Sequence, residues 1–236
     1  MVPQGEGSRE ARRQRVIDVR RQHGRDGPAW TRDKADDFER VTVPERDCDA
    51  IRDLLIREGA RRIVEIGLAY GSSALAIGEA LVSIGAAERP AHVIIDPLQA
   101  TGWSNVGWRL LQSAGLDTIA RLILQPSSTA LPQLIADGFT ADAAFVDGSH
   151  RFHEVFVDLY FLRKIVRPGG IIILDDHWWP SVRAAQHYYE TNMGWQVMRG
   201  AFDDVTVDEA TGRPRMQALR LPDPSFEPSF DEFHPF

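Results

Sequence analysis

Five short apolar runs, each followed by a stretch with helical periodicity, constrain the fold of this 236-residue chain more than any other feature. The clearest run, Ile171–Leu174, is apolar at every position, as expected of a strand buried on both faces of a parallel sheet. From Phe152 to Val166 the apolar residues follow the i, i+3, i+4, i+7 spacing of a helix. This alternation predicts a parallel sheet covered by helices, with right-handed crossovers.

Seven strands are expected in all, five of them parallel. They are predicted at residues 61–66, 91–96, 121–125, 143–147, 171–176, 195–199 and 216–221. The expected fold class is therefore α/β, with a doubly wound, mainly parallel seven-stranded sheet and helices on both faces.

The chain is predicted to carry one α/β domain with a polar extension at each end. Residues 1–43 begin with an Arg-rich stretch, which favours a partly disordered arm or a lid segment. Residues 44–221 hold all the periodic segments, and residues 222–236 carry four prolines and four phenylalanines without a period. That last stretch is expected to be an irregular tail, with a homodimer contact as one use for it.

Composition excludes several classes of protein. The formal net charge of −7 argues against a nucleic-acid partner, and a single cysteine, Cys48, excludes an internal disulfide or a multi-cysteine zinc site. No apolar run approaches the ~18 residues of a membrane span, and no apolar segment follows the N-terminal arginines. A cytoplasmic protein without a membrane partner is expected.

The carboxyl ends of parallel strands are where ligands bind in such sheets. After the first strand comes Glu65-Ile66-Gly67-Leu68-Ala69-Tyr70-Gly71, whose glycines allow a ligand to approach the backbone. The turn lacks the G-x-G-x-x-G spacing expected for a dinucleotide. Asp96 ends the second strand, where an acid can accept both ribose hydroxyls or can cap the turn before Pro97. Together these features favour an adenosine without phosphates.

Three carboxylates end two further strands. Asp147 ends the fourth strand, and Asp175 and Asp176 end the fifth. Converging carboxylates repel one another, and a hard cation such as Mg²⁺ relieves that repulsion. A solvated acidic pair is the alternative interpretation of Asp175-Asp176.

Histidines and tryptophans lie beside these acids. His150 follows Asp147 by three residues, and its ordinary pKa of about 6.5 suits a general base. Alternatively it caps or packs against the next helix. After the acidic pair come His177, Trp178 and Trp179. Their side chains either form a flat wall beside a ring-shaped substrate or pack in the core.

These motifs resemble those of class I S-adenosylmethionine-dependent methyltransferases. The turn from Glu65 to Ser73 is similar to their first motif, and residues 143–176 resemble their fourth strand, helix and fifth strand. Asp147-Gly148-Ser149-His150 with Asp175-Asp176 resembles the metal-dependent sugar O-methyltransferases of macrolide and aminocoumarin antibiotic biosynthesis. The catechol enzymes are more distant, since they carry Asp-Asn at the fifth strand and a lysine base that has no counterpart here.

The resemblance implies a Rossmann-like methyltransferase sheet and a role for each matching residue. The residues implied to contact the cofactor are Glu65, Gly67, Gly71, Ser73 (at its carboxylate), Asp96 (at its ribose), Ser127 and Ser128 (at its adenine), and Asp147. The implied magnesium ligands are Asp147, Asp175 and Asp176, and the implied catalytic residues are His150 and Asp147. The implied reaction is Mg²⁺-dependent methylation of a hydroxyl on a small molecule, a sugar or a catechol-like diol.

Other functions remain open on the same fold. They are an NAD-linked oxidoreductase, a non-catalytic nucleoside-binding protein, a hydroxylase with His150, His177 and Asp147 around a metal, and a nucleic-acid methyltransferase that uses the N-terminal arginines.

Overall fold

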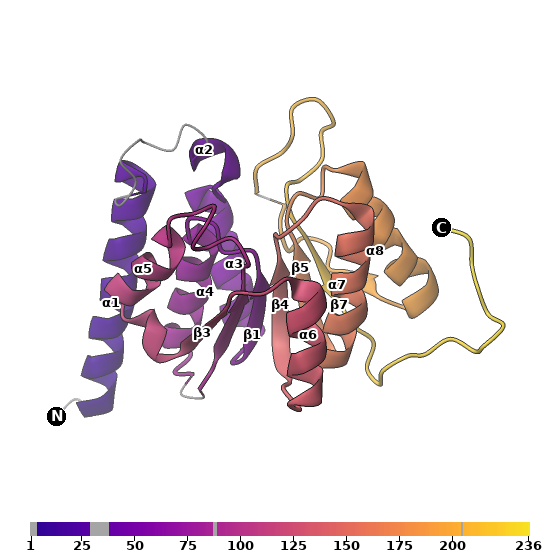
Figure 1. Ribbon diagram of the computed structural model, residues 1–236, viewed down its shortest axis with the longest axis horizontal. Helices are drawn as coiled ribbons and strands as arrows, with labels where there is room; N and C mark the ends of the chain where they lie inside the picture. Colours follow the sequence, from indigo (N-terminus) through magenta and orange to yellow (C-terminus); the bar gives the residue numbers. More distant parts are fainter. Residues whose placement is uncertain (1–3, 29–37, 87–88, 204) are drawn as a thin grey trace. The chain divides into compact units, whose positions relative to one another are not determined.

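The computed structural model describes residues 4–28, 38–86, 89–203 and 205–236 (Figure 1). The chain divides into two compact units, residues 1–125 and residues 126–236. Each unit is a layer of strands with its own helices. Within the described ranges, no helix is both long enough and apolar enough to cross a membrane.

The first unit contains three parallel strands in the order β3-β2-β1. The strands are β1 (Ile63–Ile66), β2 (His92–Ile95) and β3 (Ala120–Ile123). β1 and β2 are buried at every position, which explains why they are apolar except for Glu65 and His92. The helical elements are α1 (Gln4–Asp26), α2 (Phe38–Val41), α3 (Glu45–Arg57), α4 (Ser72–Ser83), α5 (Val106–Ser113) and the 3₁₀ turn η1 (Leu116–Thr118).

Helix α1 lies in the stretch expected to be an N-terminal arm. It packs against α4, and Val16 and Ile17 are buried there. α4 in turn is buried along almost its whole length, because Leu75, Ile77 and Leu81 face neighbouring elements on more than one side. The first helix is therefore part of the first unit, although its sequence is mostly polar.

The second unit contains four strands in the order β4-β5-β7-β6. β4 (Ala141–Val146) is parallel to β5 (Val166–Leu174), while β7 (Gln217–Arg220) is antiparallel to both β5 and β6 (Gln196–Val197). The helices are α6 (Ser127–Ala136), α7 (Phe152–Ile165) and α8 (Pro180–Met193). The described residues thus carry the seven expected strands, mostly parallel, and the predicted α/β class is confirmed.

β5 starts earlier than predicted. Pro168-Gly169-Gly170 was expected to separate helix from strand, yet β5 already begins at Val166, directly after α7. Val166 pairs with Ala141, and the register then shifts before Ala143 pairs with Ile171. The Pro-Gly-Gly segment lies inside this irregularity, which accommodates a proline and two glycines in the strand.

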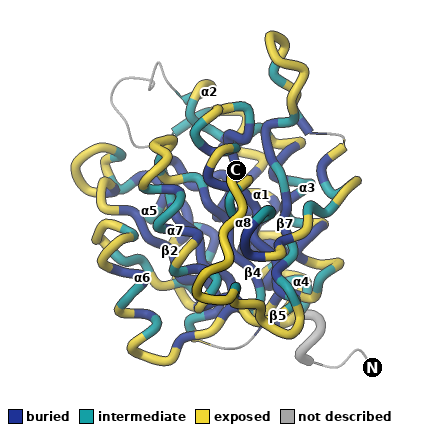
Figure 2. The backbone as a smooth tube through the Cα atoms, turned by 90° about the vertical axis from the view of Figure 1, so that its right-hand side faces the viewer, coloured by how far each residue is buried: buried dark blue, intermediate teal, exposed yellow. Residues whose placement is uncertain are grey.

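The last residues contain no helix or strand, and they are mostly exposed (Figure 2). Phe230 and Phe233 are among the exposed aromatic side chains. His234 is attached to α8 through two hydrogen bonds with Asn192, one from its backbone N–H and one to its carbonyl oxygen.

Candidate functional site

The turn between β1 and α4 has the backbone that its glycines allow. Gly67 has φ 92° and Gly71 has φ 88°, both in the left-handed region. Gly71 is the N-cap of α4 and has no side chain to cap the helix, so the first N–H groups of α4 are left to other partners. The turn also packs closely on α5, because a Cβ at Gly107 would lie 2.6 Å from the Ala69 carbonyl oxygen.

Glu65 braces this turn from inside the sheet. Its side chain is fully buried, accepts a hydrogen bond from Ser73 Oγ at 2.6 Å, and lies 2.8 Å from His92 Nε2. Ser73, expected to bind a cofactor carboxylate, therefore donates its hydroxyl hydrogen bond to Glu65 in this structure.

Asp96 is occupied in a similar way. Its Oδ2 accepts hydrogen bonds from the Leu68 and Ala69 N–H groups at 3.1 and 3.0 Å, and its Oδ1 accepts one from the Leu98 N–H at 2.7 Å. Gln99 Nε2 donates to Asp96 Oδ2 at 2.9 Å and to the Ala69 carbonyl at 2.8 Å. The sequence left two roles open for the Asp96 carboxylate, binding a ribose or capping the turn. In this structure the carboxylate accepts hydrogen bonds from the turn.

Ser127 and Ser128 begin α6 in the second unit. Ser127 donates a hydrogen bond to Asp158 of α7, which is almost completely buried. Burial raises the pKa of Asp158 to about 7, and the Ser127 hydrogen bond opposes this shift only in part. Asp158 is a buried acid that the sequence analysis did not single out.

Asp147, His150 and Asp176 form a compact group in the second unit. One ligand atom of each lies within 4.8 Å of the others. Asp147 follows β4, His150 precedes α7, and Asp176 follows β5 with φ 52°. Two carboxylates and an imidazole are a donor set that divalent cations accept, so these residues fit the expected metal.

His150 and Asp176 are in direct contact. His150 Nε2 lies 2.5 Å from Asp176 Oδ2, and the hydrogen bond to this carboxylate raises the pKa of His150. The Trp179 ring stacks on the imidazole at a centroid distance of 5.4 Å. The Ser181 hydroxyl donates to the His150 carbonyl oxygen, which holds the backbone of this residue as well.

Asp175 has a different partner from the expected cation. Its side chain is buried, and its two oxygens accept three hydrogen bonds from Arg215 at 2.8 to 3.0 Å. The guanidinium carries the opposite charge to the carboxylate and forms a bidentate pair with it. Asp175 is therefore not a member of the group of Asp147, His150 and Asp176, because Arg215 already satisfies its carboxylate.

The three residues after Asp176 have separate environments. His177 is buried, and burial lowers its pKa to about 4, so its imidazole is neutral. Trp178 lies against the Arg215 guanidinium, 5.4 Å from the ring centroid. Trp179 is 47% exposed and covers His150. Of the three, Trp179 is the one that stacks on the group around Asp176.

Sequence reasoning missed Arg215, Gln99 and Asp158. Gln99 follows Asp96 by three residues, a spacing that suits a hydrogen bond within one turn. Asp158 interrupts the apolar face of α7, which marks it as a buried polar group. Nothing in the sequence around Arg215 distinguishes it from the other arginines.

Comparisons with known proteins agree with this fold. Residues 64–177 match the model of a family described as "Methyltransferase domain". No curated protein matches the chain. A crystal structure of cofactor-bound Rv0187 from MTB is 17% identical, with a TM-score of 0.65 over 87% of this chain and 88% of that one.

Two further solved structures are similar. The O-methyltransferase TomG from Streptomyces achromogenes, involved in tomaymycin synthesis and in complex with SAM, is 18% identical, with a TM-score of 0.63 over 89% and 90% of the two chains. An O-methyltransferase from Bacillus cereus in complex with SAH is 17% identical, with a TM-score of 0.60 over 93% of each chain. The matched region runs from β1 to the residue after Asp176, and it contains both the glycine turn and the acid–histidine group. The predicted resemblance to class I S-adenosylmethionine-dependent methyltransferases is thereby confirmed.

Proposed function

We propose that this methyltransferase is a divalent-cation-dependent O-methyltransferase. It transfers the methyl group of S-adenosylmethionine to a hydroxyl of a small molecule, a sugar or a catechol-like diol. The observation that carries the proposal is the group of Asp147, His150 and Asp176, whose ligand atoms lie within 4.8 Å of one another. Magnesium is the cation proposed, because Asp147 and Asp176 supply carboxylate oxygens, the ligands that this ion prefers.

The first unit supplies the proposed cofactor site. The glycines of the turn leave backbone accessible to a ligand, and the start of α4 provides free N–H groups. Glu65 and Asp96 hold the turn in shape through buried hydrogen bonds. S-adenosylmethionine, when bound, supplies a methyl group on a positively charged sulfur. Ser127 and Ser128, at the start of α6 in the second unit, stay the adenine contacts that the sequence predicts.

The second unit supplies the proposed cation and acceptor site. Asp147 and Asp176 would hold the cation, which would supply the positive charge that lowers the pKa of an acceptor hydroxyl. His150 would take the proton of that hydroxyl on Nδ1, because its Nε2 already contacts Asp176. The contact with Asp176 makes the imidazole a stronger base and fixes its orientation. Trp179 limits ring rotation by stacking.

Calorimetric titration with MgCl₂ tests the cation part of the proposal. Asp176→Asn removes a charged ligand and is expected to weaken Mg²⁺ binding at least tenfold, while affinity for S-adenosylhomocysteine stays within a few-fold. Asp137→Asn is the matched control, since Asp137 is an exposed acid of the same unit that pairs with Gln133. Equal Mg²⁺ affinity in wild type and Asp176→Asn, or full turnover in EDTA, would refute the metal role.

A substrate panel tests the acceptor class. Sugars with vicinal hydroxyls and catechols are offered together with S-adenosylmethionine, and methylated products are identified by mass spectrometry. Since general-base catalysis contributes about 10²–10⁴-fold, His150→Gln is expected to lower kcat by that factor without changing KM for S-adenosylmethionine. A normal kcat in His150→Gln excludes His150 as the base.

A further inference from the structure

Asp176 has a backbone conformation that residues with a side chain rarely adopt. Its φ of 52° lies in the left-handed region, where residues other than glycine are uncommon. Such a conformation persists where the surrounding structure imposes it. The contacts on either side of Asp176 therefore determine where its carboxylate points.

The register of the sheet brings Arg215 to this turn. Leu174, the last residue of β5, pairs with Gln217, the first residue of β7. Because the two strands are antiparallel, the residues just before β7 run beside the residues just after β5. The Arg215 N–H donates to the Thr206 carbonyl oxygen at 2.7 Å, which ties this segment to the loop before it.

Arg215 contacts both chain neighbours of Asp176. On one side its guanidinium forms the bidentate pair with Asp175, at 2.8 to 3.0 Å. On the other side its carbonyl oxygen accepts a hydrogen bond from the His177 N–H at 2.7 Å. Arg215 is 5% exposed, and its guanidinium lies against the Trp178 ring. One buried residue thus holds three of the residues around Asp176.

The backbone of the turn is fixed at both ends as well. The Asp175 N–H donates to the Val146 carbonyl oxygen at 3.0 Å, and the Trp179 N–H donates to the Asp176 carbonyl oxygen at 2.9 Å. The Asp176 carboxylate itself contacts His150. Because Asp175 and Asp176 are adjacent in a held turn, a displacement of Asp175 also displaces the Asp176 carboxylate.

We propose that Arg215 is a positioning residue for the acid–histidine group of Asp147, His150 and Asp176. Its side chain and its carbonyl oxygen hold the turn, so that the Asp176 carboxylate faces the other two members of the group. Arg215 acts through Asp175 and is neither a cation ligand nor a base. The role toward the cation rests on the proposed function, while the role toward the contact of His150 with Asp176 does not require a cation.

The charge of Arg215 alone would have the opposite effect on cation binding. Its guanidinium interacts electrostatically with Asp147 and Asp176 as well as with Asp175. A positive charge near the two ligands repels a cation, so removing a purely electrostatic Arg215 raises the affinity for the cation. Removing a positioning Arg215 lowers that affinity. The sign of the change therefore separates the two roles.

Titration with MnCl₂, followed by electron paramagnetic resonance, measures this sign. Mn²⁺ takes the same oxygen ligands as Mg²⁺. Arg215→Met is expected to weaken Mn²⁺ binding tenfold or more. Arg167→Met is the matched control, because Arg167 of β5 pairs with Asp142 of β4 at the other end of these strands, and it should leave the affinity within twofold. An unchanged or higher affinity in Arg215→Met overturns the proposal.

Two further variants keep the test decisive if Arg215→Met does not fold. Arg215→Lys retains the charge but cannot form the bidentate pair, and it is expected to weaken Mn²⁺ binding about threefold or more. The double variant Asp175→Asn/Arg215→Met leaves no buried charge unpaired, and it is expected to weaken Mn²⁺ binding tenfold or more. Wild-type affinity in either variant refutes the positioning role.

The imidazole ¹⁵N resonances of His150 at pH 7 test the same role without a cation. Asp176→Asn provides the reference spectrum for a His150 that lacks its carboxylate partner. Arg215→Met and Arg215→Lys are expected to shift the resonances toward that reference, whereas Arg167→Met keeps the wild-type values. Wild-type resonances in Arg215→Lys overturn the proposal. A wild-type protein that binds no Mn²⁺ would instead refute the proposed cation, and the His150 resonances would still decide the role of Arg215.

Discussion

Replacing Asp158 with Asn should change how the stability of the protein depends on pH. Asp158 lies on α7, is 2% exposed, and accepts a hydrogen bond from Ser127. Burial raises its pKa from 3.8 to about 7, so the folded protein holds a proton here that the unfolded chain releases at lower pH. Asn keeps a hydrogen-bond acceptor for Ser127 and carries no charge.

The magnitude follows from the two pKa values of Asp158. Between pH 3.8 and about 7 the folded state binds more protons at this site, so the free energy of unfolding falls as the pH rises. A tenfold difference in proton affinity between the folded and unfolded states corresponds to about 1.4 kcal/mol, which gives a loss of about 4 kcal/mol for wild type by pH 8. The full contribution of the protonated form is present below the unfolded pKa. Asp158→Asn does not ionise and is expected to lack this loss.

Urea unfolding at pH 5 and pH 8 measures the difference. Wild type should lose more stability between these values than Asp158→Asn does, by about 2–4 kcal/mol. Glu154→Gln is the control on the same helix; Glu154 is less buried, and the pKa of its carboxyl is lowered by a hydrogen bond from Ser149. A pH dependence that is the same in wild type and Asp158→Asn would show that Asp158 is not protonated in the folded state.

Two other substitutions have definite outcomes. Gly107→Ala places a Cβ 2.6 Å from the Ala69 carbonyl oxygen, which pushes α5 away from the glycine turn. Calorimetry should therefore show weaker S-adenosylhomocysteine binding, and thermal unfolding should show a stability loss of about 1–3 kcal/mol. Wild-type values in both measurements would mean that α5 moves freely. Arg215→Met leaves Asp175 buried without its cation and should cost about 3–5 kcal/mol in urea unfolding. Adding Asp175→Asn should recover part of that loss, and additive effects in the double variant would contradict a direct interaction.

Much of the fold could be predicted because strands that are buried on both faces appear in the sequence as short apolar runs. β1 and β2 are buried at every position, and their apolar runs end at Glu65-Ile66 and at Asp96 as expected. The start of β5 was missed, because Pro168-Gly169-Gly170 normally ends an element and here lies in a shifted register.

The partners of the acids could not be predicted, because they come from distant parts of the chain. Arg215 is 40 residues from Asp175, and no local pattern links the two. The sequence placed Asp147, Asp175 and Asp176 at strand ends, but which of the three faces a common point depends on side-chain directions. In the structure Asp147 and Asp176 lie together with His150, while Asp175 forms an ion pair with Arg215.

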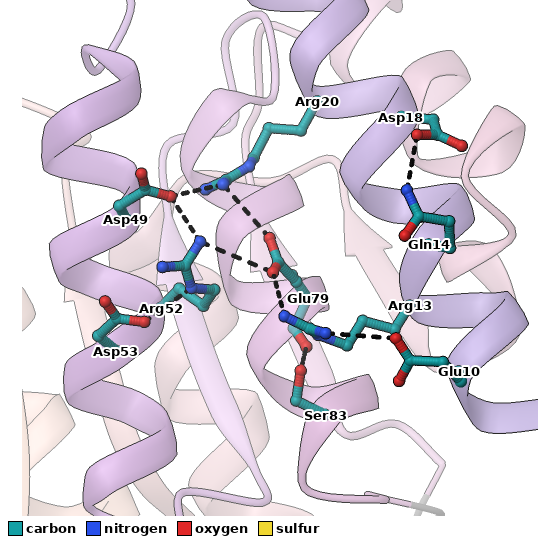
Figure 3. Close-up of polar contacts among 10 residues, drawn as sticks. All are labelled: Glu10, Arg13, Gln14, Asp18, Arg20, Asp49, Arg52, Asp53, Glu79 and Ser83. Carbon is teal, nitrogen blue, oxygen red and sulfur yellow. Dashed lines mark hydrogen bonds and ion pairs between the residues drawn. The ribbon is translucent and has the colours of Figure 1, made fainter. Parts of the chain in front are cut away.

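The N-terminal arginines illustrate the same limit. A solvated arm was the simplest interpretation of such a polar stretch, yet Arg13 and Arg20 contact Glu79 of α4 (Figure 3). The sequence feature that predicts this contact lies in α4 and not in the N-terminal stretch. α4 is an apolar helix with a single acid, Glu79, and a buried acid requires a cationic partner.

The bracing of the glycine turn by Asp96 has a thermodynamic consequence. Four hydrogen bonds from Leu68, Ala69, Leu98 and Gln99 converge on one carboxylate, all of them within the protein. The backbone of the turn has therefore already lost its conformational entropy in the folding step, and nucleoside association need not repeat that loss. Heat capacity changes on association should then reflect apolar contact area alone, with no added component from segment ordering.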